Sequence, residues 1–147
     1  MQTLALLLML PVASLGALSG CERRDETISG YVDRTARWEL VSLGGRDIDP
    51  GFLLRFPQEG QVEGASGCGP FTATQLVPYP WIEVSDQSLT ATDCAAPRDH
   101  RSALAALPAM GLAEVSDDVL ILSDADSAAE LVFRRVTPDA EPRTVSD

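Results

Sequence analysis

The chain has 147 residues, 22 Asp plus Glu, 11 arginines, no lysine and no asparagine, which gives a formal net charge of −11. This length allows one domain with a short anchor or tail. The acidic balance argues against nucleic acid as a partner, because such binding depends on cationic groups that neutralise phosphates. The lack of lysine excludes Schiff-base chemistry and a P-loop lysine, and the lack of asparagine excludes N-linked glycosylation.

The N-terminal segment predicts export. Residues 4–18 form an apolar run that is too short to span a membrane and is typical of a signal peptide. Leu18-Ser19-Gly20-Cys21 follows and resembles the lipobox of bacterial lipoproteins. The resemblance implies that residues 1–20 are a lipoprotein signal peptide and that acyl chains anchor Cys21 in a membrane. Met1-Gln2-Thr3 departs from the pattern because it carries no arginine or lysine. The alternatives are a plain secretory signal or a buried helix.

The residues after Cys21 predict the location of the protein. Glu22 rather than aspartate stands next to the anchor, which by resemblance to enterobacterial sorting rules implies the outer membrane, facing the periplasm. Residues 21–36 are polar and lack periodicity, so they predict a lipidated tether. Residues 37–136 form the predicted domain. Residues 137–147 are polar and contain proline, which predicts a disordered tail.

Lipidation of Cys21 leaves Cys68 and Cys94 as a pair. In an oxidising compartment the simplest interpretation is a disulfide. It would close a loop of about 26 residues and stabilise the fold by about 3–4 kcal/mol. No C-x-x-C motif is present, and His100 is the sole histidine, so neither a zinc site nor a redox-active pair is favoured.

The globular part has the pattern of short strands. Phe52, Leu54 and Phe56 alternate with Leu53 and Arg55, and the following turn predicts a hairpin over residues 52–64. Other strands are predicted at 38–43, 81–84, 87–91, 112–116, 118–123 and 130–136. Pro97 and Pro108 delimit one predicted helix. The predicted fold class is α+β: a small, mostly antiparallel, barrel-like β-sheet domain with one short helix.

An ordered set of residues over 36–136 resembles the META domain, also called HslJ-like, of bacterial lipoproteins and periplasmic proteins. The matching features are Trp38-Glu39-Leu40, Leu54-Arg55-Phe56, Gly60-Gln61-Val62-Glu63-Gly64, Gly67-Cys68, Phe71, Thr90, Cys94, Leu120-Ile121-Leu122 and Leu131-Val132-Phe133. The resemblance implies a compact β-sheet domain with a helix and an association with envelope stress, antibiotic tolerance or virulence. The chain departs from the family pattern at Gly69, Ala73, Thr92 and Ala95, which puts the transfer of a family site in doubt.

The residue types that catalysis needs have simpler interpretations here. His100 shares a helical face with Leu104 and Leu107, so we expect a partly buried or rim histidine rather than a catalytic one. Asp93 and Asp99 flank the helix start, where capping and the helix dipole account for them. We therefore predict no catalytic residues, no cofactor and no enzymatic activity.

The acidic run Asp124-x-Asp126-x-x-x-Glu130 superficially resembles a calcium loop. It lacks the glycine and the spacing of such a loop, so a solvated hairpin turn is the favoured interpretation and no metal site is predicted.

Tyr79 and Trp81 lie in Val77-Pro78-Tyr79-Pro80-Trp81, a stiff aromatic segment that could form a binding edge. Core packing is the favoured interpretation for Trp81, with the binding edge as the alternative. The sequence thus predicts a lipid-anchored, non-catalytic envelope protein that binds a partner protein or supports the envelope under stress. The alternative is an acidic inhibitor of a basic envelope-targeting enzyme such as lysozyme, since opposite charge accelerates encounter.

Overall fold

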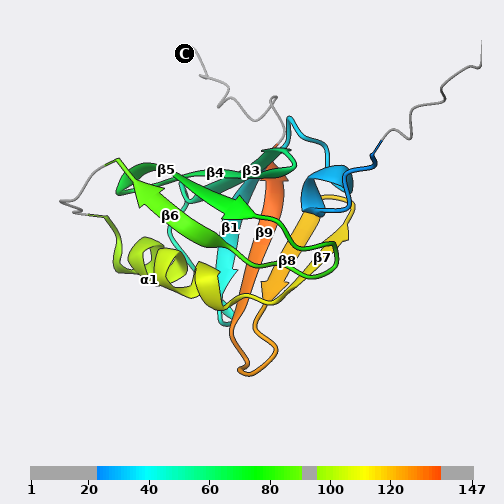
Figure 1. The fold of residues 1–147 in the computed structure, drawn as a ribbon. Coiled ribbons are helices and arrows are strands. Elements are labelled where there is room, and N and C mark those ends of the chain that lie inside the picture. The colour runs from blue at the N-terminus through cyan, green and yellow to red at the C-terminus, as the bar shows by residue number, and fades with distance from the viewer. Residues whose placement is uncertain (1–22, 91–95, 137–147) are drawn as a thin grey trace, which may run out of the picture.

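The computed structural model describes residues 23–90 and 96–136, and in these ranges nine strands form one antiparallel sheet (Figure 1). The strands are β1 (Arg37–Leu43), β2 (Arg46–Asp47), β3 (Leu53–Gln58), β4 (Gly60–Ser66), β5 (Gly69–Gln75), β6 (Ser85–Leu89), β7 (Leu112–Ser116), β8 (Val119–Ser123) and β9 (Glu130–Val136). The helical elements are α1 (Arg98–Ala106) and the short 3₁₀ helices η1 (Ile28–Gly30) and η2 (Leu107–Ala109).

The sheet has the strand order β6-β5-β4-β3-β1-β9-β8-β7, and β2 pairs separately with β1. It is curled without being closed, and α1 lies at one end of it, beneath β6 in the view of Figure 1. An isolated bridge between Trp81 and Leu112 links the segment before β6 to β7. These features confirm the predicted fold class, a mostly antiparallel sheet with one short helix.

The core fills the inside of the curled sheet, because apolar residues alternate with polar ones along the strands. Its largest fully buried side chains are Trp38, Phe52, Phe56, Phe71, Phe133, Ile28, Leu40, Leu54, Leu107, Met110, Leu120 and Leu122. Each large apolar side chain stabilises the fold by about 1.5–3 kcal/mol when it leaves water. Burial of this alternating set fixes which face of each strand points outward.

Most of the predicted elements are present. The strands at 112–116 and 130–136 match β7 and β9, and the predicted hairpin corresponds to β3 and β4. Pro97 is the N-cap of α1, and Pro108 lies in η2, where the α-helix has ended. Two predictions are wrong in detail: β6 spans Ser85–Leu89 rather than 87–91, and 81–84 forms only the single bridge at Trp81. Strand β5 has no counterpart among the predicted strands.

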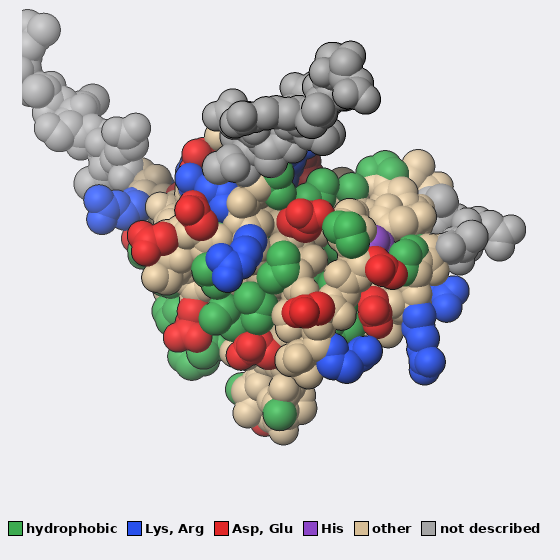
Figure 2. All heavy atoms as spheres, turned by 180° about the vertical axis from the view of Figure 1, so that it is seen from behind, with side chains coloured by type: hydrophobic (Ala, Val, Ile, Leu, Met, Phe, Trp, Pro, Cys, Tyr) green, Lys and Arg blue, Asp and Glu red, His purple; other side chains and the backbone are tan. Residues whose placement is uncertain are grey.

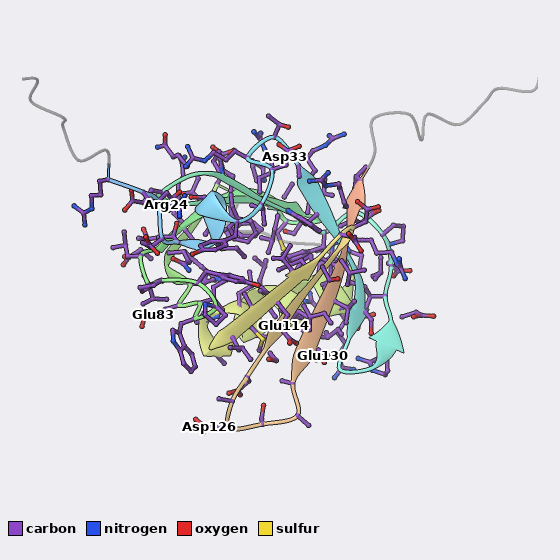
Figure 3. All side chains as sticks on the ribbon, turned by 90° about the vertical axis from the view of Figure 1, so that its right-hand side faces the viewer. Arg24, Asp33, Glu83, Glu114, Asp126 and Glu130 are labelled. Atoms are coloured by element: carbon purple, nitrogen blue, oxygen red, sulfur yellow. The ribbon has the colours of Figure 1, made fainter. Side chains whose placement is uncertain are left out.

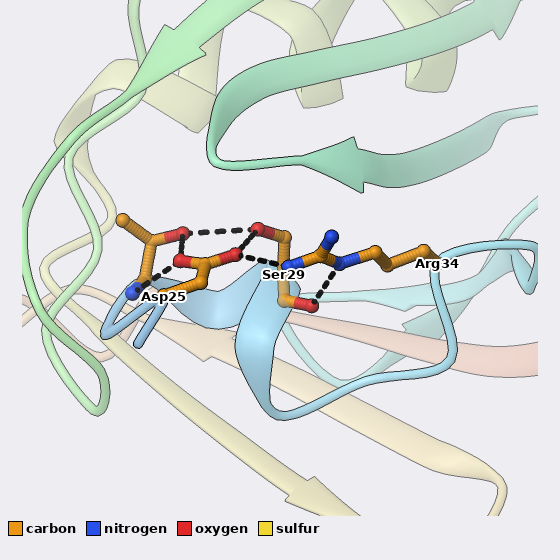
Figure 4. A network of polar contacts seen from close by, with 4 residues as sticks. Asp25, Ser29 and Arg34 are labelled. Carbon is orange, nitrogen blue, oxygen red and sulfur yellow. Dashed lines mark hydrogen bonds and ion pairs between the residues drawn. The ribbon is translucent and has the colours of Figure 1, made fainter. Parts of the chain in front are cut away.

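The described part of the predicted tether is not an extended linker. Ile28 is 1% exposed and Ser29 2% exposed, so the first two residues of η1 are buried in the domain. The Asp25 carboxylate holds this segment together (Figure 4): its Oδ1 accepts bonds from the Thr27 amide at 2.9 Å and the Thr27 hydroxyl at 2.7 Å. Its Oδ2 accepts a bond from the Ser29 hydroxyl and pairs with Arg34 Nη2 at 2.9 Å. The domain therefore begins at about residue 25 rather than at residue 37.

This carboxylate makes stability depend on pH. Burial alone would raise the pKa of Asp25, but hydrogen bonds from Ser29 and Thr27 and the charge of Arg34 outweigh it and hold the pKa below its ordinary value of 3.8. A lowered folded pKa contributes stability above the unfolded value, which is lost as the pH falls through the folded pKa.

We expect Asp25→Asn to lower the free energy of unfolding by about 1–3 kcal/mol at pH 7, because charge-assisted hydrogen bonds disappear. The difference from the wild type should shrink as the pH falls below 3.8. Urea denaturation at several pH values measures it, with Glu26→Gln, an exposed neighbour, as the control. A difference that stayed constant with pH would contradict this assignment.

Several predictions fall on residues outside the described ranges. They are the signal peptide 1–20, the lipidated Cys21, the disulfide partner Cys94, Asp93, Thr92, Ala95 and the tail 137–147. In the part of the chain that the structure describes, no helix has the length and apolar character needed to cross a membrane.

Candidate functional site

Trp81 lies on the surface. Its side chain is 60% exposed, so the prediction that Trp81 packs in the core is wrong. The neighbouring residues Ile82 and Val84 are the ones that point inward, at 3% and 2% exposure. Since side chains alternate along an extended segment, Trp81 and Glu83 point outward.

Backbone hydrogen bonds hold the segment that carries Trp81. The Ile82 amide donates to the Gly111 carbonyl at 3.2 Å, and the Ala113 amide donates to the Pro80 carbonyl at 2.8 Å. From the inside, the buried Gln75 amide nitrogen donates to the Trp81 carbonyl at 3.3 Å. These bonds tie the segment to β7 and β5, so the exposed indole stands on a fixed backbone.

Tyr79 takes part in holding the same segment. Its amide donates to the Glu26 carbonyl at 2.8 Å, and its hydroxyl accepts a bond from the Val115 amide of β7 at 3.4 Å. Tyr31 stacks on its ring with a centroid separation of 4.5 Å and an interplanar angle of 24°. Tyr79 thus covers an outward amide at the edge of β7, which protects that edge from pairing with another chain. The Tyr79–Pro80 peptide bond is cis.

Trp81 continues an apolar strip on the outer face of the sheet. Leu112 pairs with Trp81, Ile121 of β8 pairs with Glu114 of β7, and Val132 of β9 pairs with Ile121. Leu112, Ile121 and Val132 are half-buried. We call Trp81, Leu112, Ile121 and Val132 the Trp81 face. Seen from behind, the surface of the molecule carries apolar side chains gathered between acidic ones (Figure 2).

Carboxylates border the Trp81 face. Glu83 follows Trp81 by two residues, Glu114 follows Leu112 by two residues, and Glu130 starts β9; all three are exposed. Figure 3 shows these three glutamates and Asp126 on one side of the molecule. None of the three takes part in an ion pair with another described residue. An apolar surface with an acidic border is the result.

His100 is buried in a structural role. It is 2% exposed, rather than partly buried or at the rim as predicted. Its Nδ1 accepts a hydrogen bond from the Gly67 amide at 2.9 Å, so its Nε2 carries the proton that is donated to the Asp49 carbonyl, 3.0 Å away. Its ring meets Phe52 edge-on, with centroids 5.8 Å apart. Both ring nitrogens are therefore used to join the β4–β5 turn and the loop before β3 to α1.

Two of the acidic residues considered for catalysis or calcium binding, Asp124 and Asp99, have local partners. Asp124 Oδ2 accepts a bond from the Ser127 hydroxyl at 2.7 Å, and its Oδ1 accepts one from the Asp126 amide at 2.9 Å. These two bonds, in that order, hold the pKa of Asp124 below its ordinary value. Asp99 Oδ1 lies 3.6 Å from Arg46 Nη2, which makes an ion pair. Within the described ranges, no group of three or more side chains is arranged to hold a metal ion.

Cys68 is 6% exposed and lies in the turn between β4 and β5, next to the amide that binds His100. Gly69, one of the positions that departs from the resemblance, begins β5 with φ of 101°. Side chains other than glycine rarely adopt this conformation, which explains glycine here as a turn residue. Ala73, another departure, is buried at 6% exposure within β5.

The META domain family matches residues 32–137, which is most of the domain just described. The chain belongs to the META family. The match includes β1, β3, β4 and the strands of the Trp81 face, so this face lies inside the META domain. No curated protein matches the chain.

Two solved structures share the fold of this META domain. One is a crystal structure of a DUF4847 family protein from Bacteroides vulgatus, with 13% identity and a TM-score of 0.55, covering 71% of this chain and 94% of that one. The other is an NMR structure of a protein with 17% identity and a TM-score of 0.52, covering 69% of this chain and 89% of that one. At these identities the likeness supports the fold alone.

Proposed function

We propose that this META-family protein is a lipid-anchored protein of the bacterial envelope that binds a partner protein through the Trp81 face and catalyses no reaction. The observation that carries the binding role is an indole that is 60% exposed on a segment fixed by hydrogen bonds. Tryptophan is enriched among the residues that dominate binding energy, and a fixed backbone lowers the entropy lost on binding. The absence of catalysis rests on His100, whose two ring nitrogens are both occupied by the backbone.

The proposed anchor would hold the domain close to the membrane. Folded structure begins at Asp25, so only residues 22–24 separate it from Cys21. An extended chain spans about 3.3–3.6 Å per residue, so Asp25, where the domain starts, would lie within about 15 Å of the lipidated residue. A protein held this close to the membrane would meet partners in the envelope rather than soluble proteins far from it.

Intact mass of the membrane-extracted protein tests the anchor and the disulfide together. We expect a chain that starts at Cys21 and carries acyl mass, and two thiols that become reactive only after reduction. An unlipidated chain, or Cys68 and Cys94 labelled without reduction, would contradict the corresponding part of the proposal.

The acidic border favours a second candidate, an inhibitor of a basic envelope-targeting enzyme such as lysozyme. Exposed Glu83, Glu114 and Glu130 would steer and orient a cationic partner over the apolar strip. Hen lysozyme is the probe: its binding should weaken at least tenfold in Glu83→Gln/Glu114→Gln and at high salt. Glu59→Gln, an exposed change on the β3–β4 turn, is the matched control. If the affinity for lysozyme changed neither at high salt nor in the double glutamate variant, this candidate would be contradicted.

A further inference from the structure

Two arginines lie side by side on the outer face of the sheet, away from the Trp81 face. In the register of β1 and β3, Trp38 pairs with Leu54, so one step further places Arg37 opposite Arg55. Like charges on directly opposed residues of neighbouring strands are unfavourable. Arg37 forms no ion pair with any other residue that the structure describes. Among the described residues, the two arginines therefore have one ion-paired carboxylate between them, on Arg55.

A hollow of about 260 Å³ opens at this pair. Its lining includes both guanidinium-bearing residues, Leu53 and Ala65 as an apolar wall, and Glu63. Leu53 and Ala65 are directly paired across β3 and β4, which makes the wall continuous. Small-molecule sites usually measure about 300–1,000 Å³, so this hollow suits a small ligand rather than a large cofactor.

Among the described residues that line the hollow, one is acidic, Glu63, and it satisfies Arg55 only in part. Glu63 Oε2 lies 3.5 Å from Arg55 Nη1, and its Oε1 accepts a bond from the Gln61 side chain at 3.1 Å. Arg55 Nε is buried and has no hydrogen-bond partner among the described residues. A buried donor left without an acceptor is unfavourable, so an acceptor that reached it would be stabilised here.

We propose that this hollow binds a small carboxylate, with the carboxylate oxygens on Arg37 and Arg55 and a short alkyl group against Leu53 and Ala65. A planar carboxylate matches the fork of a guanidinium and can accept two parallel hydrogen bonds from it. The ligand is either a free short-chain acid or the carboxyl end of a peptide, since both present the same chemistry. The site is independent of the proposed lipid anchor and of the Trp81 face.

The test uses the full chain with Cys21→Ser and amide chemical shifts recorded by NMR. The probes are N-acetylalanine as a peptide end, propanoate as a free acid, and N-acetylalaninamide as the uncharged control. We expect saturable shifts of the Leu53 and Ala65 amides with at least one carboxylate and none with the amide. Whichever acid binds more tightly identifies the source.

Variants test whether Arg37 and Arg55 bind the carboxylate. Arg55→Gln and Arg37→Gln should each weaken binding at least tenfold, and Glu63→Gln should strengthen it by removing the competing carboxylate. Arg101→Gln, an exposed change on α1, should leave it unaltered. Equal shifts with the amide, no saturable shifts with either acid, or unchanged affinity in both folded arginine variants would overturn the proposal.

Discussion

Gly64→Ala should lower the free energy of unfolding by about 3 kcal/mol, because overpacking a filled core is costly. A Cβ at Gly64 would clash with Phe71 Cζ and lie 2.8 Å from the Leu53 carbonyl oxygen. Phe71 is 2% exposed and packs against Phe52 with ring centroids 5.8 Å apart, so its ring has little room to move. Because Gly64 has no side chain, the Phe71 ring has room to lie across β4.

Gly111→Ala is the matched control, because a Cβ there meets nothing within 4 Å. Its effect should stay within about 0.5 kcal/mol, the range of ordinary surface changes. Urea denaturation of both variants measures the difference. Equal stabilities would show that Phe71 rearranges freely and that the core around β4 and β5 is not tightly packed.

His100→Leu should cost about 2–5 kcal/mol of stability, since it leaves two backbone groups without their partner in a buried site. The Gly67 amide would lose its acceptor and the Asp49 carbonyl its donor. His100→Gln, which offers an acceptor and a donor, should recover part of the loss. Because Gly67 adjoins Cys68, the turn that carries the predicted disulfide should also loosen.

Arg101→Leu on the exposed side of α1 provides the control for the removal of a polar side chain from this helix. Denaturant unfolding and hydrogen exchange of the Gly67 amide are the measurements. Faster exchange at Gly67 in His100→Leu alone is expected. If both leucine variants unfolded at the same denaturant concentration, His100 would not be the tie between α1 and the β4–β5 turn.

Alternation of apolar and polar residues made the strands predictable. β7 and β9 match their predicted bounds because one face of each is buried and the other is not. β5 escaped prediction because its inward positions are Phe71, Ala73 and Gln75, a pattern with little apolar contrast to the outward threonines. The predicted tether was wrong from Asp25 onward because its polar groups satisfy one another only after the chain folds.

The binding surface was predictable only in part. Tyr79 and Trp81 were named from the sequence, but the exposure of Trp81 depends on the 80–82 segment covering β7 with its backbone, a long-range contact. One feature of the sequence pointed to the part of the Trp81 face that lies on β8. Both faces of this strand are apolar, because Val119, Leu120, Ile121 and Leu122 follow one another. Only the register shows that Ile121 and Val132 meet beside Trp81's pairing partner Leu112.

The most direct test of the binding role is photo-crosslinking in intact cells from a benzoylphenylalanine at position 83, next to Trp81. We predict a discrete protein adduct that disappears when Trp81→Ala is added, while the same probe at position 101 on α1 gives no such adduct. The Trp81→Ala variant should keep its stability, because the side chain it removes is 60% exposed. An adduct that persists in Trp81→Ala, forms equally from position 101, or never forms from position 83 would contradict partner binding at the Trp81 face.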